Sequence, residues 1–211
     1  MSNEIFWRRA MVFGFVVFYW AGVIVKARRV RRQIGKSPNL RPRGAKERLL
    51  WAGWFLVIVV WMAQPIFIST SSPPPWLQLV APLLQTPWLA MGVGMTLAGY
   101  AGTLWCYAAM GATWRIGINR REKNALVTHG PYRFMRHPIY SFQILMLFGA
   151  LLLLPTVLSA AILALHVVCV LAKAADEETY MLTVHGQEYR DYVSRSGKLL
   201  PKWSKNRLST G

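Results

Sequence analysis

The fold of this chain is decided by residues 49–114, LLWAGWFLVIVVWMAQPIFISTSSPPPWLQLVAPLLQTPWLAMGVGMTLAGYAGTLWCYAAMGATW, which contain no Lys, Arg, Asp or Glu. A second run without these residues extends from His137 to Ala172. A surface helix of a soluble protein needs a polar face, which neither run supplies. Both runs exceed the roughly 20 apolar residues that cross a hydrocarbon core of about 30 Å. Each run therefore predicts more than one membrane crossing.

The composition of the 211-residue chain agrees, with 54% hydrophobic and only 16% charged residues. Its net charge of +17 would usually suggest a nucleic-acid partner, but so apolar a chain is not a soluble basic domain, and we expect no nucleic acid. Cys106 and Cys169 both lie in apolar runs, which argues against a disulfide framework and a four-cysteine zinc site. We expect no metal.

The predicted fold class is an all-α integral membrane protein with about five transmembrane helices. The five predicted spans are residues 11–25 (starting near Ile5 if Arg8 and Arg9 snorkel towards the headgroups), 49–68, 87–110, 138–154 and 156–172. Pro155 separates the last two, which favours a tight helical hairpin. The alternative is one kinked helix of about 35 residues, but some 50 Å is too long for one crossing.

Charge counts predict the orientation in the membrane. Residues 26–48 hold ten Lys and Arg, residues 115–136 hold six, the chain from Lys173 onward holds seven, and residues 69–86 hold none. Because basic segments stay in the cytoplasm, we expect the N-terminus outside and the C-terminus inside, in a plasma or inner membrane if the protein is bacterial. The basic run 26–48 is typical of a topology signal on anionic lipid, and it could also draw in acidic substrates.

Polar residues that could do chemistry gather in two places. The first is the connection 115–137, where Gly130-Pro131 indicates a turn and Pro138 suits the first position of a helix. Arg136 and His137 would then oppose the helix dipole, which points either to an anionic ligand or to headgroup contacts by Arg133 and Arg136.

The second place directly follows the last predicted span. Asp176, Glu177 and Glu178 are three of the eight acidic residues of the chain. Lys173 and Glu177 share a face if the helix continues. These acids could act in a site, or they could simply solvate an amphipathic helix that leaves the membrane.

Together these residues resemble the isoprenylcysteine carboxyl methyltransferase family and, more broadly, membrane-embedded phospholipid methyltransferases. The resemblance rests on LVTHGPYR at 126–133, RHPIY at 136–140, Glu177-Glu178 and GQEY at 186–189, and covers roughly residues 87–201. We therefore divide the chain into N-terminal transmembrane helices with a basic loop (1–86), a methyltransferase core (87–201) and a basic tail (202–211).

The resemblance implies a membrane enzyme that transfers a methyl group from S-adenosylmethionine, leaving S-adenosylhomocysteine. The cofactor pocket would lie on the cytosolic side, formed by the connection before the hairpin and the C-terminal helix. Cofactor-binding residues carried over by position are Asn124, Ala125, Leu126, Val127, Tyr132, His137, Pro138, Ile139, Tyr140 and Glu177. Arg136 would join Glu177 in catalysis, and Lys173 would bind the substrate and orient it for the reaction.

The chain departs from the family pattern at three positions. Asn124 stands in place of a His. Lys173 replaces an Arg, which loses the planar fork suited to a carboxylate. Phe142 occupies a position where the family commonly has Gly, and we expect it to narrow access from the membrane.

The resemblance leaves the acceptor open. Among lipophilic or lipidated substrates drawn from the membrane lipids, an isoprenylcysteine-type carboxylate comes first, ahead of a phospholipid amine or a small thiol. Two other classes of function remain: an NADPH-dependent membrane reductase of the steroid-reductase type, and a non-catalytic scaffold whose basic loops bind lipid or a partner.

Overall fold

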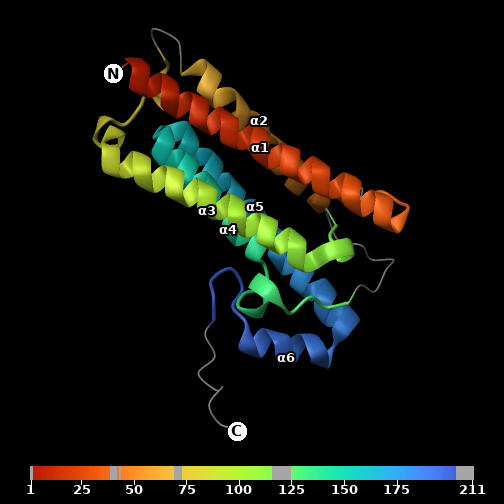
Figure 1. Cartoon of the computed structure of the whole chain (residues 1–211). Helices are drawn as coiled ribbons and strands as arrows, with labels where there is room; N and C mark the ends of the chain where they lie inside the picture. The colour runs from red at the N-terminus through yellow and green to blue at the C-terminus, as the bar shows by residue number, and fades with distance from the viewer. Residues whose placement is uncertain (1, 39–41, 43, 69–72, 116–124, 203–211) are drawn as a thin grey trace.

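A computed structural model describes residues 2–38, 42, 44–68, 73–115 and 125–202, and within these ranges the chain is a bundle of helices (Figure 1). The helices are α1 (Ser2–Ile34), α2 (Gly44–Phe67), α3 (Thr86–Met110), α4 (Pro138–Leu153), α5 (Val157–His185) and α6 (Gln187–Arg195). Figure 1 shows the N-terminus at one end of the bundle and α6 lying across the other end.

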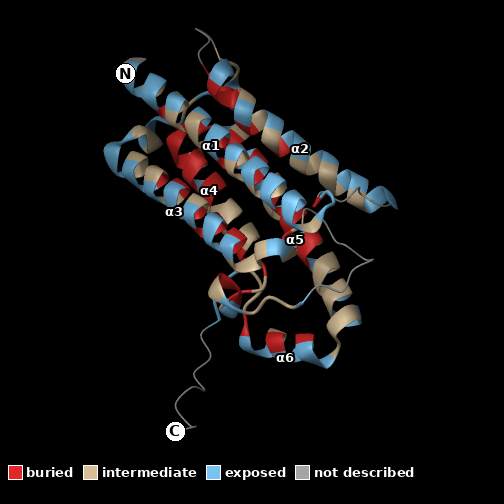
Figure 2. Cartoon of the chain, turned by 45° about the vertical axis from the view of Figure 1, so that its right-hand side comes forward, coloured by how far each residue is buried: buried red, intermediate tan, exposed pale blue. Residues whose placement is uncertain are grey.

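The helices confirm the positions of the predicted spans. Four of them, α1, α2, α3 and α5, are long and apolar enough to cross a membrane, whereas α4 is a shorter apolar helix of 16 residues. A crossing by α4 therefore stays a prediction. Helices α1 and α5 run well past the predicted spans, at both ends of α1 and at the C-terminal end of α5. Figure 2 shows exposed outer faces on α1, α2 and α3, and apolar side chains such as Phe18 and Phe55 are 66% exposed there.

Helices α3 and α4 pack closely because small residues lie between them. Gly99 and Gly102 of α3 face α4, and a Cβ added at Gly102 would lie 2.3 Å from Cδ1 of Phe142. Small residues let membrane helices approach closely, where dispersion contacts rather than water exclusion drive association. The Phe142 ring thus packs against α3, and Phe142 does not line the cavity described below. The expectation that it narrows membrane access is wrong, because Gly102 makes room for the ring.

The predicted hairpin is confirmed at Leu154-Pro155-Thr156, where α4 ends and α5 begins. Thr156 caps α5 by accepting a hydrogen bond from the Ser159 backbone N–H, 3.0 Å away. Gln64 of α2 donates to both hydroxyl oxygens, at 2.8 Å to Thr156 and 2.6 Å to Ser159. The turn is therefore fastened to α2, and the single kinked helix is excluded.

Arg8 does not snorkel towards the headgroups, which was the condition for a first span that starts near Ile5. The side chain is fully buried, and its guanidinium donates to the backbone carbonyls of Leu84, Leu152 and Leu153. Glu4, one turn away, forms an ion pair with it at 2.9 Å. A cation at the carboxyl end of α4 complements the helix dipole and satisfies carbonyls that lack partners within the helix.

Part of the basic run 26–48 is helical and structural. Lys26 lies in α1, and its Nζ donates to the carbonyls of Tyr107 (2.7 Å) and Gly111 (2.9 Å) at the end of α3. In the next helix, Lys46 forms an ion pair with Asp176 of α5 at 2.6 Å. Besides any topological role, the run therefore connects α1 with the end of α3, and α2 with α5.

Candidate functional site

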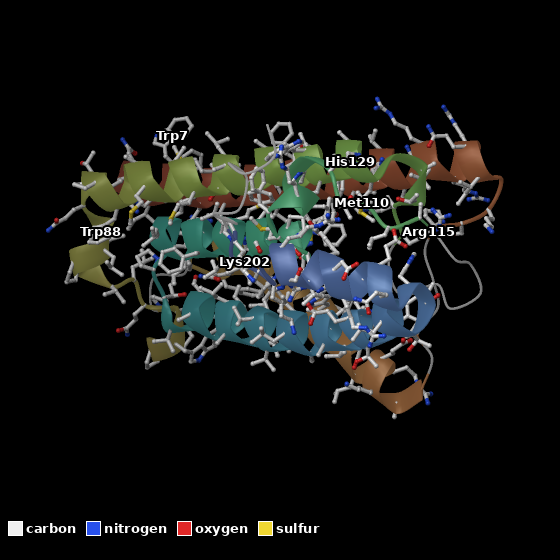
Figure 3. The ribbon with its side chains drawn as sticks, turned by 90° about the horizontal axis from the view of Figure 1, so that it is seen from below. Trp7, Trp88, Met110, Arg115, His129 and Lys202 are labelled. Carbon is white, nitrogen blue, oxygen red and sulfur yellow. The ribbon has the colours of Figure 1, made fainter. Side chains whose placement is uncertain are left out.

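A cavity of about 640 Å³ lies inside the bundle, and all six helices contribute to its wall. It extends to the end of the bundle where Met110 and Arg115 lie, away from Trp7 and Trp88 (Figure 3). We call one part the charged half, which is lined by Arg136, His137, Tyr140 and Glu177 and, from the connection before α4, by Ala125, Leu126, Val127 and Tyr132. The other part, the aromatic half, is lined by Trp20, Trp54, Trp61, Gln143 and His166.

Most of the residues predicted for a site do line this cavity. They are Ala125, Leu126, Val127, Tyr132, Arg136, His137, Ile139, Tyr140 and Glu177. These residues come from the connection before α4, from the first turn of α4 and from α5, so the fold brings together segments about 40 residues apart.

Three predicted residues have other positions. Pro138 is fully buried at the first turn of α4, as the helix-start prediction requires. Lys173 is buried on the face of α5 that also carries His166 and Glu177, but it is not among the residues that line the cavity. Asn124 lies outside the described residues.

The chain itself supplies the anion for Arg136. The guanidinium Nε donates to Glu178 Oε1 at 2.8 Å, and Nη1 donates to the Ser196 carbonyl at 2.6 Å. Lys198 Nζ lies 3.3 Å from the other carboxylate oxygen of Glu178. With only 10% of the Arg136 side chain and 20% of the Glu178 side chain exposed, this pair is shielded from water. Arg136 therefore needs neither a bound anion nor a lipid headgroup.

His137 lies between two carboxylates. Its Nδ1 is 3.4 Å from Glu177 Oε2, and its Nε2 is 3.4 Å from Glu178 Oε1, so both nitrogens are within ion-pair distance of a carboxylate. Burial by itself lowers the pKa of His137, but Glu177 and Glu178 outweigh burial and raise that pKa above its ordinary value of 6.5. The imidazolium form is thus favoured at the wall of the charged half.

Glu177 faces the cavity and is held in place from one side. The Tyr140 hydroxyl donates to Glu177 Oε1 at 2.8 Å, and the Tyr140 and His137 rings stack with centroids 5.7 Å apart. A quarter of the Glu177 side chain remains exposed. The carboxylate can therefore accept further hydrogen bonds from a ligand in the cavity.

A segment near the C-terminus supports the residues at the start of α4, and no sequence pattern indicated this contact. Residues 196–202 run beside residues 134–137, with a parallel bridge between Met135 and Gly197. The Arg136 N–H donates to the Gly197 carbonyl at 2.8 Å, and the Gly197 N–H donates to the Phe134 carbonyl at 3.0 Å. A Cβ on Gly197 would lie 1.8 Å from the Leu200 carbonyl oxygen, so only glycine fits this close approach.

His166 is a cavity residue that the sequence reasoning missed. It is 6% exposed, lies within the charge-free part of α5, and stacks on Trp54 with ring centroids 6.4 Å apart. An ionisable side chain inside a predicted membrane span is itself a signal of function, and that signal was available in the sequence.

Comparison with known proteins gives a consistent set of relatives. Residues 87–188 match the phospholipid methyltransferase family. The cobalt-zinc-cadmium resistance protein CzcN of Cupriavidus metallidurans is 30% identical over 151 residues, covering 72% of this chain and 63% of that protein. The nickel-cobalt-cadmium resistance protein NccN of Alcaligenes xylosoxydans xylosoxydans is 30% identical over 112 residues, covering 53% and 48%.

A third relative is named for a methyl-transfer activity. The probable protein-S-isoprenylcysteine O-methyltransferase of Oryza sativa subsp. indica is 29% identical over 128 residues, covering 58% of this chain and 67% of that protein. This chain therefore spans about half to two thirds of the length of these relatives. The matched region 87–188 includes every residue predicted for the site.

Proposed function

Because this chain belongs to the family of membrane-embedded phospholipid and isoprenylcysteine methyltransferases, we propose that it transfers a methyl group from S-adenosylmethionine to a lipophilic acceptor. One observation carries the proposal. Residues 125–127, Tyr132, 137–140 and Glu177, chosen by their position in the family pattern, fold around one cavity with the exception of buried Pro138.

The residues of the charged half fit S-adenosylmethionine. A cavity of about 640 Å³ lies within the range of small-molecule sites, roughly 300–1,000 Å³. Glu177 offers carboxylate oxygens to an ammonium group, and the His137 imidazolium offers a cation to a carboxylate. The rings of Tyr132 and Tyr140 on the wall suit adenine and a sulfonium. When bound, the cofactor supplies a methyl group that is already activated.

The work left to the chain is therefore alignment. Glu177, oriented by Tyr140, would accept a hydrogen bond from the donor. Arg136 is committed to Glu178 and the Ser196 carbonyl, so we now assign it a positioning role rather than a direct one. It would act by fixing the start of α4 and, through it, His137.

We propose that the acceptor enters through the aromatic half and reacts where the two halves meet. An isoprenylcysteine-type carboxylate is the first candidate, and Lys173, on the same α5 face as Glu177, would orient it. A carboxylate needs no base. An amine or a thiol must lose a proton, and Glu177 is then the candidate base because Glu178 is paired with Arg136 and Lys198.

We also propose that the end of the bundle carrying the charged half faces the cytoplasm. The ten basic residues of 26–48 and the seven from Lys173 onward support this orientation. Cysteine labelling near Ser72 from outside and near Lys123 from inside would test it. Labelling near Lys123 from the outer face would reverse the orientation.

The decisive experiment is a methyl-transfer assay on the purified full chain. Labelled S-adenosylmethionine would be offered with a prenylcysteine, a phosphatidylethanolamine or a small thiol, and NADPH binding would be measured in parallel. We expect label in one acceptor and no NADPH binding. Binding of NADPH without S-adenosylmethionine would favour a reductase, and binding of neither by the folded protein would favour a scaffold.

Variants of Lys173 test its proposed role separately. Lys173→Ala should lower turnover and leave the affinity for S-adenosylmethionine nearly unchanged, because we assign contact with S-adenosylmethionine to Glu177 and only the orientation of the acceptor to Lys173. Lys173→Arg should be at least as active if the acceptor is a carboxylate that gains from the planar fork. Loss of donor binding in Lys173→Ala, with normal turnover at saturation, would reverse the roles of Lys173 and Glu177.

A further inference from the structure

The aromatic half of the cavity gathers polar atoms that the protein leaves without partners. Among the described residues, six buried side-chain nitrogen or oxygen atoms have no hydrogen-bond partner, and all six belong to residues that line the cavity. Five of them are in the aromatic half: Nε1 of Trp20, Trp54 and Trp61, Oε1 of Gln143 and Nε2 of His166. They come from α1, α2, α4 and α5.

Other buried polar side chains of the bundle do have hydrogen-bond partners. Thr96 and Thr103 of α3 donate to carbonyls one turn back, at 2.8 and 2.9 Å. Gln64 of α2 donates to two hydroxyl oxygens at the hairpin turn. An unpaired polar group in a bilayer is expensive, and neighbouring groups here avoid that state. The unpaired atoms in the aromatic half therefore point to a ligand that completes them.

His166 is the best placed of these residues. It lies 11 residues before Glu177 on α5, about 16 Å along the helix, and so belongs to the membrane-embedded part of the cavity. Its ring stacks on Trp54, and Trp54 in turn lies 5.9 Å from Tyr140, measured between ring centroids. A row of aromatic contacts thus connects His166 to the residues that hold Glu177.

The chemistry of the unpaired atoms selects the kind of ligand. Indole N–H groups only donate, Gln143 Oε1 only accepts, and neutral imidazole Nε2 does either according to its tautomer. No Lys, Arg, Asp or Glu is among these five residues, so an ion bound here would lack a counter-charge. A neutral hydroxyl both accepts and donates, and it matches such a mixed set.

We propose that the aromatic half binds a neutral hydroxyl carried by an apolar molecule, and that His166 is a hydrogen-bonding partner of that hydroxyl. This inference rests on the proposed function in taking the bound molecule as the methyl acceptor. The binding itself requires neither S-adenosylmethionine nor methyl transfer. It deepens the proposed function by predicting an acceptor whose apolar body carries a hydroxyl. An isoprenylcysteine has a plain hydrocarbon chain, so selective binding of a hydroxyl here would place another lipophilic acceptor ahead of it.

The test uses two probes that share a carbon skeleton and differ in one hydroxyl, farnesol and farnesene. Radiolabelled farnesol is bound to the full chain in detergent without S-adenosylmethionine, and each unlabelled probe is used to displace it. We expect farnesol to displace the label at lower concentration than farnesene. His166→Phe, which keeps a ring and removes the nitrogens, should reduce this preference about three- to tenfold.

The matched control is His129→Phe. His129 is exposed and is not among the residues that line the cavity, so its removal should leave the preference at the wild-type value. His166→Asn should restore part of the preference by returning a hydrogen-bonding group. If His166→Phe does not fold, Gln143→Leu tests the same set from α4 and should also reduce the preference.

Equal displacement by the two probes in the wild type would overturn the inference. An unchanged preference in His166→Phe would do the same. The proposed function can fail on its own. If the protein binds farnesol selectively but neither binds S-adenosylmethionine nor transfers methyl groups, the methyltransferase function is contradicted and the hydroxyl-binding site is still supported.

Discussion

The two halves of the cavity treat polar side chains in opposite ways. In the charged half, Arg136, Glu178 and Lys198 pair with one another, and the Arg136 guanidinium also reaches the Ser196 carbonyl. In the aromatic half, His166 Nε2 and the indole nitrogens of Trp20, Trp54 and Trp61 have no hydrogen-bond partner among the residues that the structure describes. The charged half is therefore assembled before any ligand arrives, whereas the aromatic half leaves its polar groups for a ligand to satisfy. This difference would suit an enzyme family that binds one methyl donor in the charged half and different methyl acceptors in the aromatic half.

The largest expected effect is on donor binding in the charged half. Glu177→Gln should weaken S-adenosylmethionine binding, because one charge-assisted hydrogen bond is worth about 1.5–3 kcal/mol, or roughly 10- to 150-fold. Calorimetry on the purified protein measures this directly. Glu188→Gln, at a side chain that is 67% exposed on α6, is the matched control and should bind normally. If Glu177→Gln binds S-adenosylmethionine with an affinity within twofold of wild type, S-adenosylmethionine does not bind in the charged half as proposed.

The next effect concerns the internal ion pairs. Arg136→Ala leaves Glu178 shielded with one cation fewer, and we expect a loss of about 2–3 kcal/mol in stability. The thermal unfolding midpoint in detergent should fall by about 5–10 °C. Arg133→Ala, at an exposed arginine of the same connection, should change little. A midpoint for Arg136→Ala equal to that of Arg133→Ala would mean that the charged half is not preassembled.

A third variant tests whether the packing of α3 against α4 affects stability without affecting ligand binding in the cavity. Gly102→Ala places a Cβ 2.3 Å from the Phe142 ring, and such overpacking should destabilise the protein by about 1–3 kcal/mol. Phe142→Leu in the same chain should recover part of this loss. Gly94→Ala on α3, where a Cβ meets nothing within 4 Å, is the control. The affinities for S-adenosylmethionine and for farnesol should stay at their wild-type values, since Phe142 does not line the cavity. A change in either affinity would show that the packing of α3 against α4 shapes one half of the cavity.

The smallest effect is a dependence on pH. Because the folded pKa of His137 is raised by Glu177 and Glu178, its contribution to stability is complete below the ordinary value of 6.5 and is lost as pH rises through the raised value. The unfolding midpoint of the wild type should therefore fall more between about pH 6 and pH 9 than that of His137→Gln. Parallel curves for the two proteins would show that His137 is not charged in the folded state.

The elements of this fold were readable from the sequence because membrane helices leave long runs without charge. The limits of α3 and α4 were predicted within a residue, since Pro87 and Pro138 mark helix starts and Pro155 marks the break in the hairpin. The far ends of α1 and α5 were not, because their charged turns continue as helix beyond the apolar run. Hydropathy shows where lipid contact ends, not where the helix ends.

The residues that line the charged half were predicted from the sequence, but the ion pairs and hydrogen bonds between them were not. Arg136 finds its partner Glu178 at a distance of 42 residues along the chain, and no local pattern indicates which acid meets which base. The pairing of residues 196–202 with 134–137 uses backbone groups, which every residue has, so composition carries no trace of it. The burial of Arg8 was not predictable for a similar reason, since two of its acceptors are backbone carbonyls at the end of α4.

The pairing of residues 196–202 with the start of α4 also sets an order of events during synthesis. Helices α1 to α5 precede this segment in the chain, so they can enter the membrane while it is still being translated. Until it emerges, the backbone N–H groups of Arg136 and His137 lack the carbonyls of Gly197 and Lys198 that they bond in the finished protein. The hydrogen bonds that hold the start of α4 against this segment can therefore form only after α6 has been translated.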